Sequence, residues 1–227
     1  MHVPDGFIDA PISALAFLLA LGILAVALVK ARTELDDRTA PLAGLTAVFI
    51  FAAQMLNFPV AAGTSGHLLG GALAAILVGP WVAMLVVTVV LTVQALLFAD
   101  GGLTALGINI LNMAVVTAVV GWLVFRVGAR FVQTPKGAAL IAGVAAFLSV
   151  PAAAMAFTLE YALGGTAPVS LTAVAGAMGG VHLVIGIGEG VITGLVVAAV
   201  LASRPDVVAG VRGTPLAQPR IREAVAA

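Results

Sequence analysis

Long apolar stretches, separated by short groups of Gly, Pro and charged residues, dominate the chain. A helix needs about 20 mainly apolar residues to cross a hydrocarbon core, and fewer when it is tilted or lies inside a bundle. The pattern predicts seven such segments, at residues 12–29, 42–57, 67–79, 81–98, 104–125, 137–162 and 178–202. The third is short, and only Gly79-Pro80 separates it from the fourth, so whether these two are full spans stays open. We expect an all-α, polytopic bundle of about seven transmembrane helices.

The basic residues predict how this bundle lies in the membrane. They form three groups: Lys30, Arg32 and Arg38; Arg126, Arg130 and Lys136; and Arg204, Arg212, Arg220 and Arg222. Seven spans put all three groups on one side, and an excess of Lys and Arg marks the cytoplasmic side. We therefore expect the N-terminus outside and residues 203–227 to be a cytoplasmic tail of little regular structure.

Composition agrees with a lipid-embedded protein. The chain is 62% hydrophobic and only 9% charged, with a mean hydropathy of +1.21, whereas soluble domains are about one quarter charged. A net charge of zero argues against nucleic acid as a partner, and the absence of Cys excludes thiolate metal sites. No Lys or Arg precedes Lys30, so the start lacks the basic region of a secretory signal. We expect a free amine on Met1, because the bulky His2 disfavours removal of the initiator.

The strongly polar intramembrane residues share one predicted depth, in the outer half of the bundle. They are Asn57, His67, Gln94, Asp100, Asn109, Asn112, His182 and Glu189. Taken singly, such side chains commonly bridge helices. Ionisable and amide groups in lipid are also costly and mark binding sites or pathways. Their common depth favours a site, and we treat them as candidates for supporting a ligand or gating the bundle.

The first two residues offer nitrogen donors for a metal ion. The Met1 amine, the His2 amide nitrogen and His2 Nδ1 can close adjacent chelate rings in one plane, and Ni²⁺ or Cu²⁺, with Co²⁺ as a competitor, favours such donors. His67 is the candidate fourth donor, with Thr64 and Ser65 capping a helix that begins at His67. Its other ring nitrogen needs an acceptor, for which Asn57, Gln94 and a backbone carbonyl are alternatives. The competing interpretation is a frayed terminus.

Six motifs make the chain similar to the CbiM/NikM family, the membrane substrate-binding components of energy-coupling-factor cobalt and nickel transporters. They are MHVPDGF at 1–7, GTSGHLLGG at 63–71, GPW at 79–81, QALLFADGG at 94–102, NILNM at 109–113 and HLVIGIGEG at 182–190. The resemblance implies seven helices with the N-terminal loop inserted among them. It also implies an ion held by the Met1 amine, by His2 through its amide and imidazole, and by His67. The implied partners are a second membrane protein, ATPase subunits and a small CbiN/NikN-like accessory protein.

These features predict a non-enzymatic transport component in the cell inner (plasma) membrane. Residues 1–202 would be the metal-binding transmembrane domain, which captures Co²⁺ or Ni²⁺ at its outer face. No Gly-rich nucleotide loop occurs, so ATP hydrolysis would belong to partner subunits. One alternative is an intramembrane serine protease that uses Ser65 and His182. Another is a stand-alone proton-coupled carrier in which Glu189 and His182 form the relay.

Overall fold

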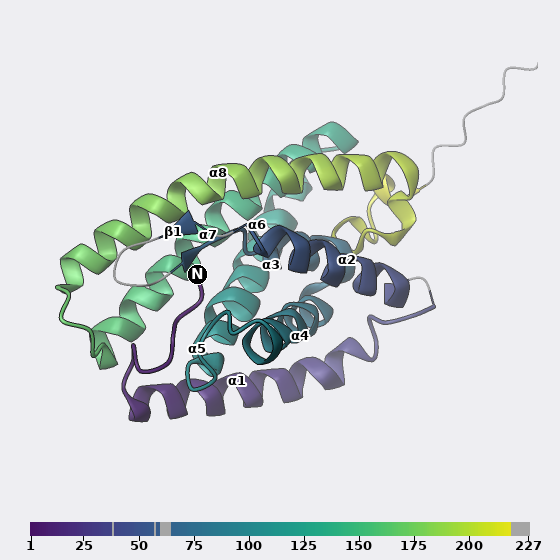
Figure 1. Ribbon diagram of the computed structural model, residues 1–227. Helices are drawn as coiled ribbons and strands as arrows, with labels where there is room; N and C mark the ends of the chain where they lie inside the picture. Colours follow the sequence, from purple (N-terminus) through teal and green to yellow (C-terminus); the bar gives the residue numbers. More distant parts are fainter. Residues whose placement is uncertain (38, 57, 60–64, 219–227) are drawn as a thin grey trace, which may run out of the picture.

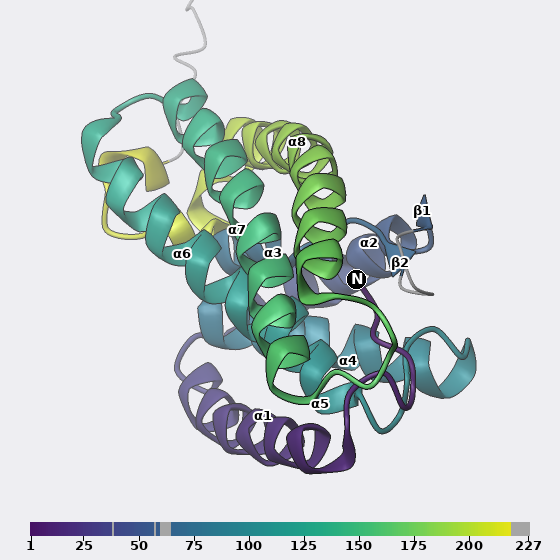
Figure 2. The same cartoon turned by 90° about the vertical axis from the view of Figure 1, so that its left-hand side faces the viewer.

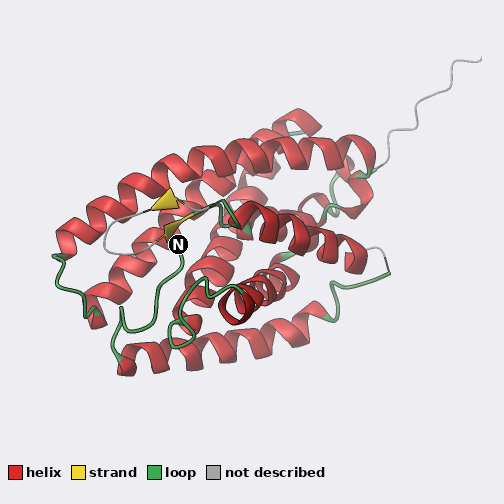
Figure 3. Ribbon diagram, viewed as in Figure 1, coloured by secondary structure: helices red, strands yellow, loops and turns green. Residues whose placement is uncertain are grey.

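The computed structural model describes residues 1–37, 39–56, 58–59 and 65–218 (Figure 1). The helices are α1 (Ala10–Ala31), α2 (Thr39–Gln54), α3 (Gly71–Val78), α4 (Pro80–Leu97), α5 (Leu106–Asn109), α6 (Thr117–Gly128), α7 (Pro135–Gly164) and α8 (Leu171–Ser203). A π-helical stretch, Ile110–Val116, joins α5 to α6, so residues 106–131 form one helical rod. The two-residue strands β1 (Phe58–Pro59) and β2 (Ser65–Gly66) pair antiparallel (Figure 3). The predicted helical bundle is confirmed.

Five of these helical segments are long and apolar enough to cross a membrane: α1, α4, residues 106–131, α7 and α8. Their outward side chains are large and apolar, as lipid contact requires; Leu18, Leu97 and Val184 are each at least 66% exposed. α2 is apolar but shorter, at 16 residues. α7 and α8 lie side by side as a long hairpin (Figure 2), and this pairing is so close that Gly143 and Gly190 meet backbone to backbone.

The third predicted segment, 67–79, is not a full helix, because only Gly71–Val78 is helical and all eight of its residues are buried. An eight-residue helix is about 12 Å long, far short of a hydrocarbon core. The chain nevertheless covers the length of α1. His67 lies against His2, before α1, whereas Gly79 lies against Glu34, after α1. The non-helical residues before Gly71 make up the missing length, because such backbone can rise by more than the 1.5 Å per residue of a helix.

The turn between α3 and α4 was predicted from Gly79-Pro80, and the structure has it there. Gly79 takes φ 94°, a left-handed conformation that suits Gly, and Pro80 occupies the first turn of α4. The Glu34 carboxylate accepts a hydrogen bond from Val82 N at 3.3 Å, and so satisfies one of the free amides at the start of α4.

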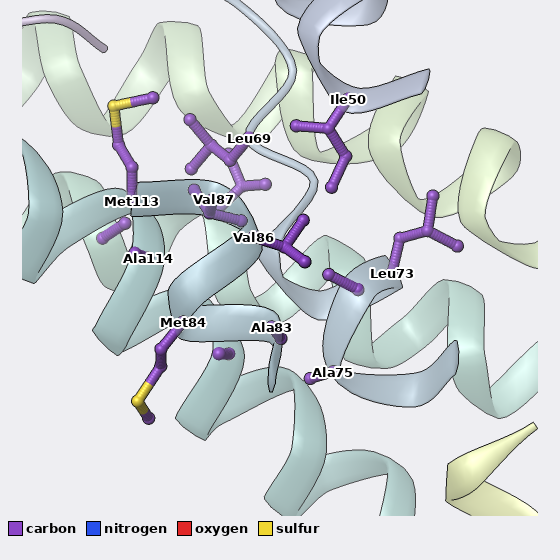
Figure 4. Close-up of a cluster of buried hydrophobic side chains, with 14 of the residues drawn as sticks. Ile50, Leu69, Leu73, Ala75, Ala83, Met84, Val86, Val87, Met113 and Ala114 are labelled. Carbon is purple, nitrogen blue, oxygen red and sulfur yellow. The ribbon is translucent and has the colours of Figure 1, made fainter. Parts of the chain in front are cut away.

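Apolar side chains surround α3 at the centre of the bundle. Leu69 and Leu73 pack with Ile50 of α2, Val87 of α4 and Met113 of the π-helical stretch (Figure 4). Packing of this density has no room for added atoms, so α3 is fixed from several sides at once.

Residues 205–218, which the sequence assigned to a tail of little regular structure, fold back on the bundle as short 3₁₀ turns. Val208 and Val211 are fully buried. Arg126 Nη1 donates to Gly210 O at 3.3 Å, and Arg212 Nη2 donates to Thr39 Oγ1 at 2.9 Å. The described part of the tail therefore covers the end of the bundle near α3 and α6.

The close contact between α3 and α6 predicts that one methyl group added at Gly121 lowers the stability of the fold. A Cβ at Gly121 would lie 2.4 Å from Ala72 Cβ and 2.6 Å from Ala72 Cα. We expect Gly121→Ala to lower the free energy of unfolding by about 1–3 kcal/mol through overpacking. Gly44→Ala on α2, where nothing lies within 4 Å, is the matched control and should leave stability unchanged or raised. Thermal unfolding in detergent measures both, and equal melting temperatures would contradict the packing described here.

Candidate metal site

The first three residues lie inside the bundle, beside the β1–β2 pair (Figure 1), and Met1, His2 and Val3 are 1%, 4% and 1% exposed. Asn109 binds the backbone of Val3 on both sides: Oδ1 accepts from Val3 N at 2.8 Å, and Nδ2 donates to Val3 O at 3.3 Å. Gly102 N donates to the same carbonyl at 2.9 Å. The predicted insertion of the N-terminal loop is confirmed, and a terminus held in this way is not frayed.

Further anchors tie the outer part of this loop to distant segments. Asp5 Oδ1 accepts hydrogen bonds from Thr104 N at 2.7 Å and Thr104 Oγ1 at 2.6 Å. Thr166 Oγ1 donates to Gly6 O at 2.5 Å, and Thr166 N donates to Phe7 O at 3.1 Å. Asp9 then caps α1 by accepting from Ile12 N. The loop is therefore fixed along its whole length, which positions its first residue.

The imidazoles of His2 and His67 stack with their ring centroids 4.5 Å apart and their planes 30° apart. His2 Nε2 lies 3.2 Å from Gln94 Oε1 and His2 Nδ1 lies 2.9 Å from Asp100 Oδ1, so an amide and a carboxylate hold the ring. His67 Nδ1 donates to Leu68 O at 2.7 Å, and its buried Nε2 has no hydrogen-bond partner. His67 therefore keeps a lone pair on Nε2.

Of the three acceptors considered for the ring of His67, the backbone carbonyl is the one that the structure has. A backbone carbonyl, that of Leu68, orients the ring, whereas Gln94 serves His2 instead. Asn57 lies outside the described residues. The predicted cap by Thr64 and Ser65 is wrong, because α3 begins at Gly71 after an N-cap at Gly70 that has no side-chain cap bond. Thr64 and the Ser65 side chain lie outside the described part of the chain.

Residues 67–70 form no helix, and side chains from two helices bind their backbone. Glu189 of α8 accepts hydrogen bonds from Leu69 N at 2.5 Å and Gly70 N at 2.6 Å, one on each oxygen. Gln54 of α2 donates through Nε2 to Leu69 O at 2.7 Å. Buried backbone groups need such partners when no helix or sheet supplies them. Glu189 therefore holds the segment that carries His67. Gln54 was missed by the sequence analysis, although an amide inside an apolar run was the available signal.

Asn112 and His182 lie in the bundle interior, where, within the described part of the chain, their hydrogen bonds link helices or bind helix backbone and do not join them to the N-terminal loop. Asn112 Nδ2 donates to Glu160 Oε2 at 2.6 Å, which links the π-helical stretch to α7. Glu160 was also missed, and its signal was a carboxylate within an apolar helix. His182 Nδ1 bonds Met178 O at 2.8 Å, and its Nε2 is buried without a partner. His182 lies well inside α8 rather than at its start, because α8 begins at Leu171.

Burial also affects the protonation of the Met1 amine and of the His2 and His67 imidazoles. It lowers the pKa of the Met1 amine well below its usual value, although the negative charges of Asp100 and Glu189 raise that pKa. Burial, with the charge of that amine, likewise lowers the pKa of His67. It lowers the pKa of His2, although the neighbouring Asp100 works in the other direction. All three groups therefore favour the neutral form that can bind a metal ion.

No cluster of three or more His, Cys, Asp or Glu side chains suited to a metal ion occurs among the described residues. The nitrogen donors here come partly from the chain terminus, since the Met1 amine and the His2 amide accompany the two imidazoles. Asp100 lies next to them, with Oδ1 2.9 Å from His2 Nδ1.

Comparison with known proteins places this arrangement in a family. Residues 2–207 match the sequence model of CbiM, described as the cobalt uptake substrate-specific transmembrane region. A putative fused nickel transport protein NikMN of Archaeoglobus fulgidus is 42% identical over 208 residues, which cover 92% of this chain and 68% of that protein. The cobalt transport protein CbiM of Sorangium cellulosum is 36% identical over 211 residues, which cover 91% of this chain and 94% of that protein.

The fold agrees with these relatives. A crystal structure of a truncated transition metal transporter superimposes with a TM-score of 0.82 at 34% identity, covering 88% of this chain and 98% of that one. A second crystal structure, of a transition metal transporter, gives a TM-score of 0.82 at 33% identity over 88% of this chain and 92% of that one. From its sequence, its helical bundle and its inserted N-terminal loop, this chain belongs to the CbiM family.

Proposed function

We propose that this chain is the substrate-binding component of an energy-coupling-factor importer for Co²⁺ or Ni²⁺, and that it captures the ion at the outer face of the plasma membrane. The observation that carries the proposal is the buried N-terminus, whose amine lies with two stacked imidazoles. The names of the relatives, which refer to cobalt and to nickel transport, support the same substrates.

The proposed ligand set consists of the nitrogens at the buried N-terminus and on His67. The Met1 amine, the His2 amide nitrogen and His2 Nδ1 would close one five-membered and one six-membered chelate ring, and His67 Nε2 would supply the fourth nitrogen. Among divalent ions, Ni²⁺ is the one best suited to a planar set of nitrogens, with Co²⁺ as a competitor. Glu189 and Gln54 would act through the backbone, by holding the segment of His67 in place.

The partners are proposed from the relatives. Fused proteins named NikMN combine two components in one chain, and this chain spans 68% of the length of the Archaeoglobus relative. We propose a NikN-like accessory partner, together with a membrane coupling protein and ATPase subunits that supply the energy. Residues 1–202 would form the metal-binding domain, with the N-terminus outside and residues 203–227 on the cytoplasmic side.

Two alternatives receive less support. A stand-alone proton-coupled carrier would use Glu189 and His182 as its relay, yet both oxygens of Glu189 already accept backbone amides. An intramembrane protease would need His182 beside Ser65, whose side chain lies outside the described residues. The relatives are named as transport proteins, which favours transport over proteolysis.

Extending the N-terminus tests the chelate directly. One extra residue before Met1 converts the amine into an amide and fills a site in which Met1 is 1% exposed. We expect calorimetry to show that tight binding of Ni²⁺ and Co²⁺ is lost. One residue added after Ala227 is the control and should leave affinity unchanged. Equal affinity of the two extended proteins would refute the amine as a ligand.

Replacement of His67 tests the fourth donor. His67→Ala removes Nε2 from the site, so we expect bound metal, measured by elemental analysis of purified protein, to fall by at least about tenfold. His182→Gln is the matched control, because His182 is equally buried and also has one ring nitrogen bound to a carbonyl. It should retain bound metal, and loss of metal in both variants would point to a different ligand set.

The affinity for metal should fall as pH falls, because protons compete for the amine and the imidazoles. Since burial lowers the pKa of Met1, His2 and His67, the loss should occur at lower pH than for an exposed site. Calorimetry from about pH 8 to about pH 5 on the protein, and on a peptide of residues 1–7 as control, measures the difference. Coinciding pH profiles would show that burial does not protect these ligands.

A further inference from the structure

The segment that follows α8 covers the end of α3 opposite the candidate metal site. Residues 205–217, here called the strap, lie at the far end of the bundle from the N-terminus (Figure 1). Val211 is fully buried. A Cβ at Gly210 would lie 3.2 Å from Ile76 O of α3 and 2.5 Å from Phe125 Cε1 of α6, so a larger residue has no room there. The strap therefore packs directly on the last turn of α3.

Two arginines bind the strap to other helices. Arg126 of α6 donates to Gly210 O at 3.3 Å. Arg212 of the strap donates to the hydroxyl of Thr39, the first residue of α2, at 2.9 Å, and its charge also acts on Glu34. The strap therefore connects the beginning of α2 with the end of α3.

Both α2 and α3 reach from the strap to the backbone beside His67. α2 ends at Gln54, whose Nε2 donates to Leu69 O at 2.7 Å. α3 begins directly after its N-cap, Gly70. A Cβ at Gly70 would lie 2.7 Å from Ile50 Cγ1, so α2 also packs on this residue. Each of the two helices thus has one end at the strap and the other end within three residues of His67.

Helices are stiff enough to carry a displacement from one end of the bundle to the other. The 16 residues of α2 are about 24 Å long, and α3 is buried along its whole length. Packed elements of this kind change between discrete arrangements rather than deform gradually. The strap itself consists of short 3₁₀ turns, which open more easily than long helices. Opening of the strap would free one end of α2 and of α3 together.

We propose that the strap is a conformational latch that couples the far end of the bundle to the metal site. This inference rests on the proposed function. While the strap is bound, α2 and α3 hold His67 in the position that binds the ion. When the strap is displaced, this position is lost and the ion dissociates faster. The latch gives a partner protein at that end a means of releasing an ion that is bound at the opposite end.

Hydrogen–deuterium exchange of the purified, unchanged protein, with and without Ni²⁺, tests the coupling. Coupling between two sites is reciprocal, so bound metal must stabilise the strap as the strap stabilises bound metal. We expect the amides of the strap to exchange at least about fivefold more slowly with Ni²⁺. The turn at residues 129–134 is the internal control, because it lies between α6 and α7 and contacts neither the strap arginines' partners nor a proposed ligand. Its exchange should not change. Equal exchange of the strap in both states, or equal slowing of strap and control, would overturn the latch.

A pair of arginine variants tests the same coupling from the strap. Arg212→Gln removes the contact with Thr39, and we expect Ni²⁺ to dissociate about fivefold faster when a chelator is added. Arg204→Gln is the matched control, because Arg204 is also exposed but pairs with Asp206 at 2.9 Å. Its dissociation rate should match that of the unchanged protein. Equal rates in the two variants would contradict the latch, whereas absence of metal binding by the unchanged protein would refute the proposed function itself.

Discussion

Non-helical backbone inside an apolar bundle is the constraint on which this structure depends. Residues 1–3 and 67–70 lie outside any helix or strand and are mostly buried, so water cannot satisfy their amides and carbonyls. Side chains do so instead. Asn109 pairs with Val3, and Glu189 binds Leu69 and Gly70. Polar residues gather at this end of the bundle because two pieces of backbone need them there, and those pieces carry the amine and the imidazoles.

This constraint explains which features the sequence could predict. Hydropathy located the long helices, since lipid contact requires apolar side chains on every outward face. It failed at residues 67–70, because a non-helical segment buried in protein is as apolar as a helix. Shared depth grouped Gln94, Asn109 and Glu189, which do contact the N-terminal loop or residues 67–70, but the partner of each polar group depends on tertiary contacts. The pairing of Gln94 with His2 crosses 92 residues, and that of Glu189 with Leu69 crosses 120. No local pattern records such pairs.

The different surroundings of the two histidines show how much chemistry these distant contacts decide. His67 is oriented by the carbonyl of the next residue, whereas His2 is oriented by a side chain of α4. Stacked rings 4.5 Å apart would repel each other if both were charged, and burial favours the neutral form of each. The result is a set of neutral nitrogens, which suits Ni²⁺ or Co²⁺ and disfavours Mg²⁺ and Ca²⁺, ions that prefer oxygen.

The position of α3 determines what release of an ion to the opposite end must involve. All eight residues of α3 are buried, and they fill the bundle between the non-helical segment of His67 and the turn at Gly79. A divalent ion cannot pass through packed Leu and Ile side chains without a prohibitive loss of hydration. Passage therefore requires α3 or its neighbours to move, and with them the backbone that Glu189 and Gln54 hold. Under the function proposed above, release of the ion towards that end would require this packing to change, and such a change is easier to reconcile with an energised partner than with passive diffusion.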